Sequence, residues 1–142
     1  MSMRVEEWMK HPVTSVKPRD SAAHARAIMS ERRVNQLPVL AGPKLVGIVT
    51  DRDLRDAFPS LAEVAGGRGQ PRRDADPANI AVEDVMTRDP LTIEPGMPLV
   101  TAARLLRTER IGSLPVVHDG RLVGILTRSD LLDAFVERLE AE

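Results

Sequence analysis

Two Thr-x-x-Asp patterns contain the residues of this sequence whose types and spacing are best suited to chemistry. Thr50 and Asp53 form the first pattern, and Thr127 and Asp130 repeat it 77 residues later. Each pattern closes an apolar run with the length of a buried strand, and its polar residues are typical of the start of a helix. Each copy therefore brings a hydroxyl and a carboxylate to a strand end, where open α/β structures bind ligands.

The same pattern has a second interpretation, in which it serves the helix alone. Threonine at a helix start caps backbone N–H groups, and aspartate in the first turn interacts favourably with the helix dipole. A single copy would favour the cap at least as much as a ligand. Two copies after matching glycine-bearing strands favour a ligand seat, and both roles can coexist because a cap leaves other N–H groups free.

The elements that must position these patterns are duplicated. Residues 5–54 align with residues 82–131 without a gap, and 16 of the 50 pairs are identical. We expect repeat one at 3–57, a linker rich in Gly, Pro and charge at 58–79, and repeat two at 80–138. A unit of about fifty residues buries little surface alone. We therefore expect the copies to pack around a pseudo-two-fold axis as one globule.

Each copy is predicted to have the order β-α-β-β-α, which places the chain in the mixed α/β class. An acidic turn and a short extended segment precede the first helix, with an N-cap at Asp20 or Ser21 in copy one and Pro98 in the first turn of copy two. The expected apolar helix faces are Ala22, Ala25 and Met29 in copy one, and Leu99, Ala102, Ala103 and Leu106 in copy two.

Turn residues predict a hairpin after each first helix. Gly42-Pro43 and Asp119-Gly120 are turn dipeptides between apolar runs, and the prolines of the preceding Leu-Pro-Val runs suit a strand edge or start. A second helix follows each hairpin. We expect the helix of copy two to extend from about residue 129 towards 138, and Pro59 to end that of copy one early.

The composition argues against several classes of function. A net charge of −1 and 2% aromatic residues disfavour nucleic-acid binding. The absence of cysteine excludes disulfides and thiolate chemistry. His11, His24 and His118 have no acidic or histidine neighbour at ligand spacing, so no metal site is expected. Without a signal-peptide core or a long apolar window, we expect a cytoplasmic protein with no membrane partner.

The duplication, the two Leu-Pro-Val strands and the two Thr-x-x-Asp closures, in the same order twice, resemble a cystathionine-β-synthase (CBS) domain pair. The resemblance covers residues 3–57 and 80–138. It implies a regulatory module that binds an adenosine-containing ligand, such as AMP, ADP, ATP or S-adenosylmethionine, in the cleft between the copies. No further cofactor is implied.

The resemblance also implies roles for site residues. Asp53 and Asp130 would bind ribose hydroxyls, because a carboxylate accepts two hydrogen bonds from a vicinal diol. Thr50 and Thr127 would meet phosphate, since a hydroxyl and free N–H groups at a helix start suit that anion. The strand starts that would line the adenine slots are Pro12, Val13 and Thr14, and Pro90, Leu91 and Thr92. The sequence leaves open which strand start serves which pattern.

Three positions near each pattern make the two expected sites unequal. Some relatives place a basic residue near phosphate three residues before the strand proline, where this chain has uncharged residues. Asp51 adds a negative charge beside the first pattern, whereas Arg128 occupies the equivalent position beside the second. Arg52 would reach phosphate in the first site, where the second site has Ser129. The paired positions are Asn35 with Gly112, Asp51 with Arg128, and Arg52 with Ser129.

The favoured hypothesis is a non-catalytic sensor of adenosine-containing ligands. The alternative is an interaction or dimerisation module whose sites have degenerated. An enzyme is not expected, because the sequence has no nucleophile–base pair and no glycine-rich phosphate loop. We expect a homodimer through exposed faces of the second helices, with Leu132, Phe135 and Val136 as candidates, and a further regulated protein as partner.

Overall fold

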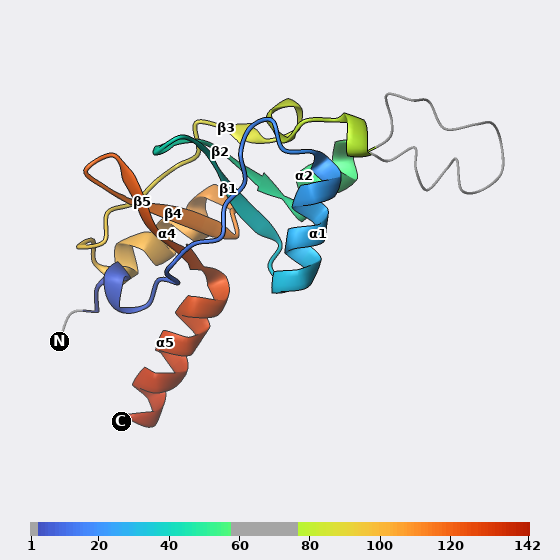
Figure 1. Ribbon diagram of the computed structural model, residues 1–142. Helices are drawn as coiled ribbons and strands as arrows, with labels where there is room; N and C mark the ends of the chain where they lie inside the picture. Colours follow the sequence, from blue (N-terminus) through green and yellow to red (C-terminus); the bar gives the residue numbers. More distant parts are fainter. Residues whose placement is uncertain (1–2, 58–76) are drawn as a thin grey trace, which may run out of the picture. The chain divides into compact units, whose positions relative to one another are not determined.

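The computed structural model describes residues 3–57 and 77–142 of the chain (Figure 1). It divides the chain into two compact units. The split unit is made of two segments, Met1–Val13 and Pro90–Glu142, and the continuous unit is Thr14–Asp89. The predicted helix end at Pro59 and the predicted linker up to residue 76 lie outside the described residues.

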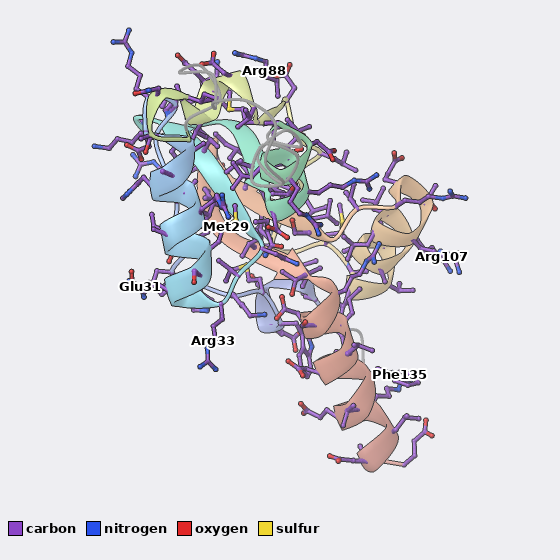
Figure 2. All side chains as sticks on the ribbon, turned by 90° about the vertical axis from the view of Figure 1, so that its right-hand side faces the viewer. Met29, Glu31, Arg33, Arg88, Arg107 and Phe135 are labelled. Atoms are coloured by element: carbon purple, nitrogen blue, oxygen red, sulfur yellow. The ribbon has the colours of Figure 1, made fainter. Side chains whose placement is uncertain are left out.

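Among its described residues, the continuous unit combines a small antiparallel sheet with the helices α1 and α2. Its described elements are α1 (Ala22–Arg32), β1 (Gln36–Ala41), β2 (Lys44–Thr50), α2 (Asp51–Ala57), η3 (Pro77–Asn79), η4 (Val82–Asp84) and β3 (Thr87–Arg88), with strand order β1-β2-β3. The predicted face of α1, Ala22, Ala25 and Met29, is buried with Leu37 and Val49 in one core. In Figure 2, Met29 lies on the side of α1 that faces the strands, whereas Glu31 points away.

The split unit repeats this plan. Its described elements are η1 (Val5–Glu7), α4 (Leu99–Glu109), β4 (Ser113–His118), β5 (Arg121–Thr127) and α5 (Arg128–Glu140). Strands β4 and β5 pair antiparallel. Leu99, Ala102 and Leu106 are buried as predicted, and Ala103 is half-buried.

Local chemistry accounts for the ends of these elements. The Ser21 hydroxyl accepts a hydrogen bond from the His24 N–H at 3.0 Å and caps α1, while Pro98 is the N-cap residue of α4. Both predicted hairpins form with two-residue turns. Gly42 has a φ of 61° and Gly120 one of 77°, a left-handed conformation that glycine adopts without steric cost.

The prolines within β1 and β4 fit because their missing N–H faces away from the hairpin partner. Pro38 accepts a hydrogen bond from Val16 N at 3.0 Å, and Pro115 accepts one from Ile93 N at 3.0 Å. The N and O atoms of one strand residue point to the same side, so neither proline removes a hydrogen bond from its hairpin. The extended segments predicted before the first helices each form an isolated parallel bridge, Val16 with Val39 and Ile93 with Val116.

The first residues of each sequence copy belong to the unit that contains the other copy's hairpin. Val5 N donates to Met97 O at 3.0 Å, and Val5 is buried in the core of the split unit. Val82 N donates to Asp20 O at 2.7 Å, and Val82 is buried in the core of the continuous unit. The compact units are therefore a different division of the chain from the repeats expected at 3–57 and 80–138.

Candidate functional site

The first Thr-x-x-Asp pattern lies where β2 ends and α2 begins. Thr50 N donates to Asp53 Oδ2 at 2.9 Å, and Asp53 N donates to Thr50 Oγ1 at 3.0 Å. This reciprocal pair is a capping box. The other carboxylate oxygen, Oδ1, lies 3.5 Å from the hydroxyl of Thr87 in β3. We call Thr50, Asp53 and Thr87 the Asp53 seat.

The second pattern has the same geometry where β5 meets α5. Thr127 N donates to Asp130 Oδ2 at 2.8 Å, and the Thr127 hydroxyl lies 3.1 Å from the same oxygen. The ammonium of Lys10 donates to Oδ1 and lies 3.5 Å from the Thr127 hydroxyl. We call Thr127, Asp130 and Lys10 the Asp130 seat.

Burial makes the Lys10 contact energetically important. The Asp130 side chain is 5% exposed, whereas the Lys10 side chain is 54% exposed. A buried carboxylate is costly unless hydrogen bonds and an opposite charge compensate it. The Thr127 N–H and the Lys10 ammonium supply that compensation, so one oxygen of Asp130 is used by the helix cap and the other by the lysine.

Backbone pairing fixes where Lys10 and Thr87 lie. Lys10 and Ile125 exchange two backbone hydrogen bonds of 2.9 and 3.0 Å, next to Gly124. In the continuous unit, β3 pairs with β2 so that Thr87 lies opposite Ile48. The segment before the first strand of each copy therefore completes the seat formed by the other copy's Thr-x-x-Asp pattern.

Gly47 in β2 and Gly124 in β5 permit this close approach of the two segments. A Cβ at Gly47 would lie 2.9 Å from the carbonyl oxygen of Thr87, and one at Gly124 would lie 3.1 Å from that of Lys10. Such a Cβ would also collide with the sulfur of Met86 or Met9, respectively. A strand glycine often marks a place where another backbone passes closely, and both glycines do so here.

Asn35 and Gly112, the uncharged residues where some relatives have a basic residue, support the seats through their backbone. Asn35 O accepts a hydrogen bond from Asp51 N at 2.8 Å, and Gly112 O accepts one from Arg128 N at 3.3 Å. The structure thus brings each of these residues to the first helical residue after its Thr-x-x-Asp threonine.

The two arginines among the predicted site residues, Arg52 with its expected reach to phosphate and Arg128, lie away from the seat carboxylates. Arg52 is exposed, and its Nε lies 3.9 Å from Asp56 on the same helix. Arg128 is exposed and borders an apolar groove of the split unit with Phe135. Within the described residues, no hydrogen bond or ion pair joins either guanidinium to a seat carboxylate.

The predicted strand starts are divided between the units. Pro12 and Val13 follow Lys10 in the split unit, and Thr14 begins the continuous unit. Pro90, Leu91 and Thr92 belong to the split unit, although Thr87 and Arg88 just before them pair with β2 in the continuous unit.

Sequence reasoning missed Lys10 and Thr87. Both occupy the same position of the repeat, since residue 10 plus the 77-residue offset is residue 87. Lys10 lies two residues before Pro12 and Thr87 three residues before Pro90, the first residues of the strand starts already singled out as site residues. A mismatch between a cation and a neutral hydroxyl at that aligned position is the signal that distinguishes the two seats.

His118 has two acidic neighbours in space, although no acidic residue at metal-ligand spacing was expected for it. Its Nδ1 lies 3.6 Å from Glu94 and its Nε2 3.4 Å from Asp119. Within residues 3–57 and 77–142, no group of three His, Cys, Asp or Glu side chains is arranged to hold a metal ion. In the same part of the chain, no helix is long and apolar enough to cross a membrane.

Comparison with known proteins identifies the family of the chain. The family model described as the CBS domain matches residues 5–60 and 82–137. A CBS domain-containing protein of Dictyostelium discoideum is 35% identical over 144 residues, which cover 99% of this chain and 96% of that protein. An inosine-5'-monophosphate dehydrogenase of Korarchaeum cryptofilum is 34% identical, but the match covers 90% of this chain and only 23% of that enzyme.

Two solved structures are similar over nearly their whole length. CBSX2 of Arabidopsis thaliana in complex with AMP has a TM-score of 0.76 and 33% identity, covering 94% of this chain and 96% of CBSX2. The CBS domain pair of protein MJ0100, in complex with 5'-methylthioadenosine and S-adenosyl-L-methionine, has a TM-score of 0.79 and 26% identity, covering 97% of this chain and 99% of that pair.

Proposed function

Since the chain belongs to the CBS domain family, we propose that it is a regulatory module that binds an adenosine-containing ligand, such as AMP, ADP, ATP or S-adenosylmethionine. The observation that carries this proposal is the position of the two seat carboxylates. In both seats Oδ2 is fixed by the backbone N–H of the preceding threonine. The carboxylate is thereby held in one orientation, with Oδ1 on the side reached by Thr87 or Lys10.

A fixed carboxylate oxygen is suited to the vicinal diol of a ribose. It accepts strong hydrogen bonds from hydroxyl groups, and its orientation costs no further entropy when the ligand arrives. Two relatives with solved structures, CBSX2 and the MJ0100 pair, were crystallised with adenosine-containing ligands. These complexes support the class of ligand that we propose for the seats of this chain.

The role of such a ligand would be regulatory. A ligand changes the behaviour of a partner only if it binds two arrangements of the protein with different affinity. We infer no catalytic step. The match to the K. cryptofilum enzyme is confined to 23% of its length, which gives no ground for assigning that enzyme's activity to this chain.

Calorimetric titration of the purified protein with AMP, ADP, ATP and S-adenosylmethionine tests the proposal. Saturable binding is expected, and Asp53→Ala or Asp130→Asn should weaken it at least about tenfold at the affected seat, because a hydrogen bond to a charged group is lost. Asp56→Ala and Asp133→Ala are matched controls, since each removes an exposed carboxylate from the same helix. If folded protein binds none of these ligands, the proposal fails.

We further propose that the protein forms a homodimer through α4 and α5 of the split unit. Leu132, Phe135, Val136 and Leu139 are exposed and follow the spacing i, i+3, i+4, i+7, which forms one stripe on a helix. The stripe borders an apolar groove of about 730 Å³ that Leu99 and Val100 of α4 help to line. In Figure 2, Phe135 projects from the ribbon of α5.

A second copy of the chain is the occupant that this surface suits. The groove and the protruding stripe lie on the same unit, so a two-fold axis can set the stripe of one copy into the groove of the other. Such an isologous contact uses the same surface patch on both subunits and closes on itself. Exposed apolar surface of this kind usually marks an interface.

A further inference from the structure

The two seats differ at one aligned position that faces the seat carboxylate. Oδ1 of Asp130 receives the ammonium of Lys10, whereas Oδ1 of Asp53 lies 3.5 Å from the neutral hydroxyl of Thr87. In both seats a threonine N–H holds Oδ2. The structure therefore varies the charge opposite the carboxylate while keeping its orientation.

Neighbouring residues enlarge this difference in charge. Residues 51–53, Asp-Arg-Asp, carry −1, and residues 128–130, Arg-Ser-Asp, carry 0. Adding Thr87 leaves the first sum at −1, and adding Lys10 raises the second to +1. On α2, moreover, Arg52 lies 3.9 Å from Asp56 and Arg55 lies 3.5 Å from Asp51, so both arginines already face acids.

We propose that Lys10 makes the Asp130 seat selective for a phosphorylated nucleoside, whereas the Asp53 seat accepts a nucleoside without phosphate. The inference rests on the proposed function, because it assumes that the carboxylates bind ribose. It assigns to each seat a class of ligand defined by charge.

Competition for Asp130 Oδ1 is the physical basis of this selectivity. A ribose diol that binds this oxygen must take the place of the Lys10 ammonium, which then needs another anion. A phosphate on the same ligand supplies that anion. The Lys10 side chain is 54% exposed and flexible, so it can move from the carboxylate to a phosphate at the mouth of the seat.

An uncharged nucleoside gains less at the Asp130 seat. It would break the Lys10–Asp130 pair without replacing the lost charge. At the Asp53 seat the same ligand disturbs only the long contact with Thr87, and the surrounding charge of −1 disfavours phosphate. AMP and adenosine differ in the phosphate alone and are therefore the discriminating pair of probes.

The experiment measures AMP and adenosine affinities of one seat at a time by calorimetry. The Asp53→Ala background reports the Asp130 seat, and the Asp130→Asn background reports the Asp53 seat. In the first background, AMP is expected to bind at least about tenfold tighter than adenosine, because an ion-paired hydrogen bond to phosphate is gained. Lys10→Thr, which copies the chain's own residue at position 87, should bring the AMP-to-adenosine ratio close to one.

The reciprocal change tests the same idea in the other seat. In the Asp130→Asn background, Thr87→Lys should raise the AMP-to-adenosine ratio several-fold, and Lys10→Arg in the first background should keep the ratio high. Circular dichroism and thermal unfolding establish that each variant is folded. If the protein binds the probes but Lys10→Thr leaves the AMP-to-adenosine ratio unchanged, the role of Lys10 is overturned while the proposed function stands. If the parent protein binds neither probe, this inference falls, and the proposed function falls with it only if ADP, ATP and S-adenosylmethionine also fail to bind.

Discussion

The ammonium of Lys10 contacts the carboxylate of Asp130, although 120 residues separate them in the chain. The contact joins the segment before the first helix to the first turn of α5, the last helix. Its counterpart, the contact between Thr87 and Asp53, spans 34 residues and contains no cation. The ion pair thus contributes both to the fold of the split unit and to the difference between the seats.

A double-mutant cycle should detect this ion pair as a coupling free energy. Lys10→Met and Asp130→Asn remove one charge each, and their combination should destabilise the protein by less than the sum of the two single changes. We expect a coupling of about 1 kcal/mol, the upper end for exposed pairs, because Lys10 is half exposed. Urea unfolding of the four proteins measures it.

The exposed pair of Arg55 with Asp51 on α2 provides the control cycle. Its side chains are 72% and 55% exposed, so Arg55→Met and Asp51→Asn should couple by only about 0.3–0.5 kcal/mol, as surface helix pairs do. Equal coupling in the two cycles would show that burial of Asp130 does not strengthen the Lys10 contact.

Alanine at Gly124 should destabilise the split unit. The new methyl group would collide with the Met9 side chain, which must repack, and would lie 3.1 Å from the Lys10 carbonyl oxygen, which must give way by a few tenths of an ångström. Overpacking of this kind costs about 1–3 kcal/mol. Thermal or urea unfolding of Gly124→Ala measures the loss, and Gly47→Ala should act in the same way through Met86 and Thr87.

Gly96→Ala is the control for both glycine variants. No atom lies within 4 Å of a Cβ placed at Gly96, so its change in stability should stay within about 0.5 kcal/mol. A Gly124→Ala protein as stable as Gly96→Ala would mean that the N-terminal segment does not lie against β5.

Local sequence chemistry was sufficient to predict most helices and turns. The N-cap of α1 was predicted at Asp20 or Ser21, because either side-chain oxygen can accept a backbone N–H, and the structure places it at Ser21. The Asp119-Gly120 turn was recognised because glycine tolerates positive φ, and Gly120 has a φ of 77°. These predictions succeeded because both cause and effect lie within a few residues.

The sequence did not predict that the segment before the first strand of one copy completes the seat of the other copy. Nothing local to Lys10 indicates that it lies beside Asp130, because the pairing of residue 10 with Ile125 depends on which strand edge the segment meets. A strand glycine often marks a close backbone approach, but none was predicted from Gly47 or Gly124. The structure shows that the segments around Met86 and Met9 pass close to these glycines.

Removal of the Ser21 cap should weaken α1 without disturbing the seats. Ser21→Ala deletes the oxygen that accepts the His24 N–H, and such changes cost about 1 kcal/mol. Ser30→Ala is the control, because Ser30 is exposed within the same helix and alanine there favours the helix by a few tenths of a kcal/mol. Urea unfolding should separate the two variants, and equal stability would contradict the capping role.

A charge on the apolar stripe of α5 should convert the proposed homodimer to a monomer. Phe135 is 59% exposed, so Phe135→Asp leaves the core intact while placing a carboxylate where the second copy would bury it. Sedimentation equilibrium should give a dimer mass for the wild type and a monomer mass for the variant. Thr108→Asp, which adds the same charge at an exposed position near the end of α4, should remain dimeric. A wild type that is monomeric at all concentrations, or a Phe135→Asp protein that stays dimeric, would rule out this interface between copies.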